Sequence, residues 1–118
     1  MPYTFPKSHR LAGVGTFKAI LDLRVKEVRS PLVIFAKPND LPYARLGISI
    51  GRPVGTATVR NRIKRLLRES FRLMQHDWPR GYDLVVIVRP HKPLLLADYQ
   101  KNLSGAMVKL HNKWEAKR

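Results

Sequence analysis

The stretch from Gly51 to Arg72, GRPVGTATVRNRIKRLLRESFR, carries seven Lys or Arg residues and the single acid Glu69. At about 100° per residue it predicts an amphipathic helix. Its apolar face would hold Val59, Ile63, Leu66, Leu67, Ser70 and Met74. Its opposite face would hold Arg60, Asn61, Lys64, Arg65, Arg68 and Arg72. The first face can pack on a core, which leaves the second face for a partner.

The composition of the basic face indicates what that partner is. Arginine grips phosphate oxygens in pairs and stacks on bases, so an arginine-rich face suits structured nucleic acid. The alternative is an ordinary solvated face, but such faces usually alternate in sign and gain i,i+4 ion pairs. Here the like charges repel one another, which favours the binding interpretation.

The whole chain has the composition of a small basic globular protein. It has 118 residues, a formal charge of +15, a pI near 11 and no cysteine. This length predicts a single domain over residues 1–118, and the charge predicts a polyanionic partner. The absence of cysteine is typical of a reducing compartment, so we expect a soluble, cytoplasmic protein. No apolar run approaches a membrane span, and membrane-surface binding is a weak alternative because the helix's apolar face is needed for the core.

Around the basic helix the sequence predicts an α+β fold. Residues 1–10 are expected to form an N-terminal arm, 11–23 a short helix, and 32–36 and 44–50 strands. Residues 83–89 are apolar on both faces and predict a central strand, a helix begins near Asp98, and 115–118 form a basic tail. If residues 25–50 contain two or three strands, the order is αβββαβα, and the helices are expected to cover one face of a small mixed sheet.

Residues that could perform hydrolysis are not grouped in the sequence. Metal-dependent nucleases need several converging carboxylates, whereas the eight acids here are scattered singly. The four histidines show no metal-ligand spacing. We therefore expect no catalytic residue and no metal ligand in this chain.

The run VGTATVRNRIKRLLRE, Val54 to Glu69, resembles the signature of the protein subunit of bacterial ribonuclease P, with Arg60, Asn61 and Arg62 at its centre. The resemblance extends to an N-terminal Arg-Leu pair at Arg10 and to Phe17 and Phe35, so nearly the whole chain follows the family order. It implies a small α-β sandwich whose crossover through the basic helix is left-handed, although sterics favour the right-handed form.

The resemblance also implies a function. The family removes the 5′ leader of precursor tRNA by hydrolysis of one phosphodiester bond, with a large catalytic RNA that holds Mg²⁺. The protein is an accessory subunit without chemistry of its own. Its expected partners are therefore ribonuclease P RNA and precursor tRNA, with no membrane and no obligate protein partner.

Two residue groups follow from this resemblance. The predicted contacts with the catalytic RNA are Arg52, Arg60, Asn61, Arg62, Lys64, Arg65, Arg68 and Arg72. The predicted contacts with the leader are Phe17, Leu21, Phe35, Ser49, Arg52 and Arg89. Arg62 could instead be a boundary residue of the helix, and both phenylalanines could instead belong to the core. The chain departs from the family at Leu21, where a second aromatic is common, and at Pro53, where a second basic residue is common.

Two other functions share some of these features. A structural RNA binder of ribosomal type would have the same size, charge and lack of an active site. A DNA-binding module would use the basic helix in a major groove, but it would need a helix just upstream where the sequence predicts a strand.

Overall fold

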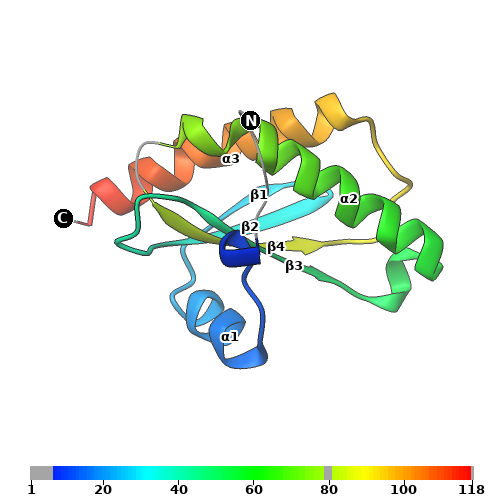
Figure 1. Ribbon diagram of the computed structural model, residues 1–118, viewed down its shortest axis with the longest axis horizontal. Helices are drawn as coiled ribbons and strands as arrows, with labels where there is room; N and C mark the ends of the chain where they lie inside the picture. Colours follow the sequence, from blue (N-terminus) through cyan, green and yellow to red (C-terminus); the bar gives the residue numbers. More distant parts are fainter. Residues whose placement is uncertain (1–6, 79–80, 118) are drawn as a thin grey trace.

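The computed structural model describes residues 7–78 and 81–117 and contains one four-stranded mixed sheet with three α-helices (Figure 1). In chain order the elements are α1 (Val14–Asp22), β1 (Lys26–Arg29), β2 (Leu32–Pro38), β3 (Arg45–Ile50), α2 (Ala57–Met74), β4 (Tyr82–Val88) and α3 (Leu96–Glu115). Short 3₁₀ turns lie at Lys7–His9, Arg52–Val54 and Gln75–Asp77. The predicted αβββαβα order and α+β class are confirmed.

The sheet order is β1-β2-β4-β3, which places β4 between two neighbours as its apolar sequence predicted. β2 runs antiparallel to β1 and β4, whereas β3 runs parallel to β4. The parallel pair is joined through α2, so the expected β-α-β crossover is present. The left-handedness of this crossover stays a prediction. No helix among the described residues is long and apolar enough to cross a membrane.

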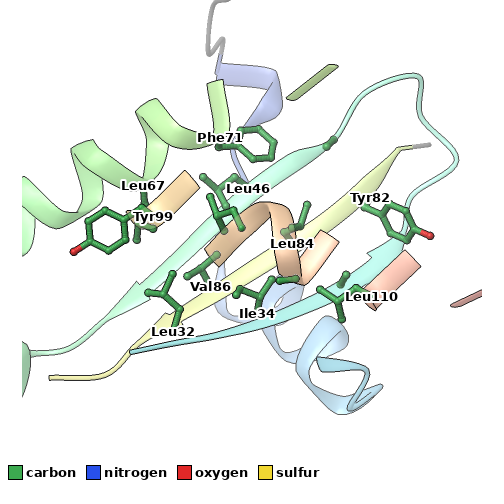
Figure 2. Close-up of a cluster of buried hydrophobic side chains, with 14 of the residues drawn as sticks. Leu32, Ile34, Leu46, Leu67, Phe71, Tyr82, Leu84, Val86, Tyr99 and Leu110 are labelled. Atoms are coloured by element: carbon green, nitrogen blue, oxygen red, sulfur yellow. The ribbon is translucent and has the colours of Figure 1, made fainter. Parts of the chain in front are cut away.

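The main core lies between the sheet and the helices α2 and α3. Figure 2 shows strand residues Leu46, Leu84 and Val86 facing Leu67 of α2 and Leu110 of α3. These side chains are almost fully buried, and each buried large aliphatic side chain contributes about 1.5–3 kcal/mol. This core therefore holds one side of α2 against the sheet and leaves the other side of the helix facing outward.

The prediction that the helices all cover one face of the sheet is wrong for α1. α1 lies on the side opposite α2 and α3 (Figure 1). There Ile20 packs in a second cluster with Val33, Phe35 and Val85, all from the strand positions that point away from the main core. The physical reason is that β2 and β4 are apolar on both faces, so the second face also requires a cover.

The ends of two helices differ slightly from the predicted bounds. α1 begins at Val14 instead of Leu11, because the N–H of Leu11 donates to the carbonyl of Leu46 at 2.8 Å and so pairs with β3. α3 begins at Leu96, and Asp98 accepts the N–H of Leu95 at 3.3 Å. The predicted arm lies outside the described residues at positions 1–6, and its remainder includes the turn Lys7–His9. Of the predicted tail, Glu115 is the last residue of α3.

Candidate nucleic-acid interface

The loop after β3 determines where the basic helix begins. Gly55 has φ of 155°, and a Cβ there would lie 3.0 Å from Cγ1 of Val59, so glycine suits this position. Thr56 then accepts the N–H of Val59 on its hydroxyl at 3.3 Å. This bond satisfies one of the free donors at the helix start, so Thr56 caps α2.

The face of α2 that meets the core is the predicted one. Ile63, Leu67, Ser70 and Met74 are buried, and the Ser70 hydroxyl donates to the carbonyl of Leu66 at 2.8 Å. Phe71 is also fully buried, which the sequence analysis missed although it lies one turn after Leu67 (Figure 2). With this stripe held down, the basic stripe of α2 must face outward.

The outward stripe carries a dense group of cations, which we call the basic face of α2. Asn61, Arg62, Arg65 and Arg68 are exposed, whereas Arg60, Lys64 and Arg72 are partly buried. Arg60 donates Nε–H to the carbonyl of Gly55 at 3.2 Å, which orients its guanidinium at the helix start. Among the described residues, Arg62, Lys64, Arg65 and Arg68 make no side-chain hydrogen bond or ion pair, so their charges are available to a ligand.

Arg72 is the exception on this face. Its Nε donates to Oε2 of Glu69 at 3.0 Å, and a second N–H of the guanidinium bonds the other carboxylate oxygen. The hydrogen bonding raises the pKa of Arg72 and lowers the pKa of Glu69. Arg72 is thus paired with Glu69 within the protein, and an RNA contact there would compete with Glu69.

A hollow of about 210 Å³ lies beside the basic face, between α2 and the outer edge of β3. Lys64 and Arg68 line it from α2, Arg10 lines it from the N-terminal segment, and Leu46 lies on its β3 side. Arg10 reaches this position because it forms a bridge to Leu46 on β3. The size and charge of the hollow suit a phosphate group, and the position of Arg10 follows from strand pairing that the sequence did not reveal.

The predicted leader residues on α1 and β2 lie together on the opposite face of the sheet, but with unequal exposure. Phe17 is half-buried and its ring covers Gly47 of β3, where an added Cβ would lie 2.6 Å from two ring carbons. Phe35 is only 8% exposed and packs in the α1 cluster, as does the partly buried Leu21. Phe17 is therefore the more accessible platform for a base.

The remaining predicted leader residues lie toward the carboxyl ends of the parallel strands β3 and β4. Ser49 is exposed and is aligned with the partly buried Ile87 of β4. Arg52 follows β3 and Arg89 follows β4, and both are exposed at the same end of the sheet. Ile87, which was not among the predicted leader residues, offers an apolar contact between Ser49 and the α1 cluster.

The buried carboxylate of Asp83 serves the fold. Asp83 accepts two hydrogen bonds from Arg45, at 2.7 and 2.6 Å, and one from the amide of Asn39 at 2.9 Å. Within residues 7–78 and 81–117, no three His, Cys, Asp or Glu side chains come together in a way that could hold a metal ion.

Comparison with known proteins identifies the family. The family model described as Ribonuclease P matches residues 5–111, which is most of the chain. The chain belongs to the ribonuclease P protein family. This confirms the resemblance that the Val54 to Glu69 signature predicted.

Individual relatives agree with the family match. The chain is 46% identical over 74 residues to the ribonuclease P protein component of Methylococcus capsulatus, a match that spans 62% of this chain and 58% of that relative. The RNase P protein of Staphylococcus aureus has a similar structure, with a TM-score of 0.71 and 28% identity over 89% of this chain and 96% of that one. The RNase P protein of Thermotoga maritima gives a TM-score of 0.67 and 30% identity over 81% and 92% of the two chains.

Proposed function

We propose that this chain is the protein subunit of a cytoplasmic ribonuclease P, which binds the catalytic RNA and the 5′ leader of precursor tRNA and so assists removal of the leader. The observation that carries the proposal is the basic face of α2 in a chain of this family. Arg62, Lys64, Arg65 and Arg68 have no protein partner among the described residues, and RNA phosphates would supply one.

The basic face is assigned to the catalytic RNA. Arg60, Asn61 and Arg62 lie near the start of α2, and the amino end of a helix adds a favourable field for phosphate. The hollow beside Lys64 and Arg68 would receive one phosphate of the same RNA. These contacts would hold the RNA by charge and shape, since a helix face that contacts backbone reads little sequence.

The α1 side of the sheet is assigned to the leader. A single strand presents its bases to aromatic rings, and Phe17 offers a half-exposed ring above Gly47. Ser49, Arg52 and Arg89 would hold the leader backbone where β3 and β4 end. Phe35 and Leu21 would support this surface mainly from within the cluster, because both are packed there.

Mg²⁺ is assigned to the RNA subunit. Such an ion needs oxygen ligands in near-octahedral geometry, and the described residues bring no such group of carboxylates together. The protein's contribution to the reaction is then positional: its cations offset phosphate repulsion between the leader and the catalytic RNA. Less Mg²⁺ would then be needed to hold the two RNAs together.

The decisive experiment measures leader cleavage at low Mg²⁺ by bacterial ribonuclease P RNA with and without this protein. We expect strong rescue by the wild-type chain and weaker rescue by Lys64→Ala, Arg65→Ala and Arg68→Ala. Lys101→Ala is the matched control, because Lys101 is exposed on α3 and lies outside the basic face. If about six phosphates are contacted, the log–log salt slope of RNA binding should be about −4 to −5, and each lost cation should flatten it by about one unit.

The runner-up function makes a different prediction in the same assay. A structural RNA binder of ribosomal type would bind RNA tightly through the same basic face without any effect on leader cleavage. A folded wild-type sample that binds RNA but gives no rescue would therefore reject the proposed function and favour that alternative.

A further inference from the structure

A second basic surface lies at the far edge of the sheet from α2. An open hollow of about 570 Å³ is formed where α1 leads into β1 and where α3 ends. Its cations are Arg24, Lys26, Lys113 and Lys117, and all four are exposed. The neighbouring acids are Glu27, which binds Lys113 at 3.1 Å, and Glu115 at the end of α3. A net positive charge remains, so the hollow suits a phosphate backbone.

The hollow is continuous with the α1 side of the sheet. Lys26 is aligned with Phe35 across the β1-β2 pair, and its ammonium lies 5.7 Å from the centre of the Phe35 ring. Lys26 therefore belongs both to the rim of the α1 cluster and to the hollow. A nucleic-acid strand that passes from Phe17 along the rim of the α1 cluster, in which Phe35 is packed, would reach this hollow at Lys26.

Arg24 supplies an independent observation. Its φ is 58°, in the left-handed region, and its N–H donates to the carbonyl of Leu21 at 3.0 Å just after α1 ends. Glycine or asparagine usually occupies this position after a helix, because a Cβ is disfavoured there. An arginine at such a position places a cation at the mouth of the hollow at some cost to the backbone, which points to a use for its side chain.

We propose that this hollow binds the backbone of leader nucleotides that lie beyond Phe35, farther from the cleavage site. The proposal rests on the proposed function and extends the leader path to the β1 edge of the sheet. Leader nucleotides near the cleavage site would lie by Ser49 and Phe17. More distant ones would follow the rim of the α1 cluster and place their phosphates against Arg24, Lys26 and Lys117. Lys113 would act mainly within the fold, because it also donates to the carbonyl of Lys26.

The test uses reconstituted holoenzyme and a series of precursors whose leader is shortened one nucleotide at a time. The variant Arg24→Gly/Lys117→Ala removes two cations, and the glycine suits the left-handed backbone, so thermal stability should not fall. Lys101→Ala/Lys109→Ala removes the same charge from exposed positions of α3 outside the lining of the hollow.

For wild-type holoenzyme we expect affinity to rise with leader length and then level off. The Arg24→Gly/Lys117→Ala variant should level off at a shorter leader, bind long-leader precursors several-fold more weakly, and flatten their salt slope by about 1.4, at about 0.7 per cation on a single strand. Binding of the shortest leaders should be unchanged, and the control variant should resemble wild type.

Three results would overturn the proposal. An equal loss at every leader length would assign the hollow to the catalytic RNA or the tRNA body, and no loss would leave the cations as surface charge that offsets the α3 dipole. If the wild-type protein fails to assist cleavage even of short-leader precursors, the proposed function fails and this inference fails with it. The short-leader reactions thus separate the two failures.

Discussion

The contact between Phe17 and Gly47 allows a quantitative test of how α1 is attached to the sheet. A Cβ at Gly47 would lie 2.6 Å from Cε1 and Cζ of Phe17 and 3.1 Å from Cβ of Leu11. Ordinary contact needs about 3.5–4.0 Å, so the ring would have to move by about an ångström. Overpacking of this kind costs about 1–3 kcal/mol of stability, against which alanine gains about 0.5–1 kcal/mol over glycine in a strand. We expect Gly47→Ala to lower the free energy of unfolding by about 1–2 kcal/mol.

A double-mutant cycle isolates the contact. In a Phe17→Ala background the ring is absent, so Gly47→Ala should cost almost nothing, and the coupling energy should be about 1–2 kcal/mol. Chemical denaturation of the four proteins measures it. The leader affinity of Gly47→Ala should also fall, because the displaced ring is the most accessible aromatic of the proposed leader surface. A coupling below about 0.3–0.5 kcal/mol, the range for independent sites, would refute this account of Phe17.

Three further substitutions test other parts of the structure. Asp83→Ala would remove the carboxylate that binds Arg45 and one of the two acceptors of the partly buried Asn39 amide, and we expect a loss of about 2–4 kcal/mol in chemical denaturation. Gly81→Ala would place a Cβ 2.1 Å from the backbone carbonyl of Leu41, which cannot rotate away, so thermal unfolding should show a loss of about 3 kcal/mol or more. Lys64→Glu would place an acid four residues from both Arg60 and Arg68 of α2. We expect it to stabilise the fold by about 0.5 kcal/mol, measured by calorimetry, and to weaken RNA binding, measured by filter binding.

The elements that the sequence predicted well are those with one strong period. α2 shows a clear helical alternation of apolar and basic residues, and most of its buried face follows from it. The apolar run of β4 likewise indicated a central strand. Phe71 was missed because the predicted apolar face continued from Leu67 to Ser70 and Met74, although Phe71 lies on the same side of the helix.

The features that the sequence did not reveal depend on contacts between distant segments. α1 lies opposite the other helices because β2 and β4 have a second apolar face. The predicted arrangement, with all helices on one side, would have left that face exposed to solvent. The two predicted leader phenylalanines differ in exposure because Phe35 lies in a strand beneath α1, whereas Phe17 lies at the edge of that helix. The left-handed backbone at Arg24 has no sequence signal, since arginine gives none of the usual indications of such a position.

The distribution of acids explains why most cations on the basic face of α2 have no acidic partner. Many acids of the described residues interact with cations, a histidine or a helix start, among them Asp22, Glu27, Glu69, Asp83, Asp98 and Glu115. Within the first three turns of α2, Ala57 to Arg68, there is no acid, although one such residue would relieve the repulsion between Arg60, Lys64 and Arg68. Each like-charged i,i+4 pair costs only about 0.2–0.5 kcal/mol, far less than the burial of Ile63 and Leu67 contributes on the other side of the helix. The core can therefore hold α2 in place against its own repulsion, and the uncompensated charge of the basic face remains available to the RNA partner that we propose.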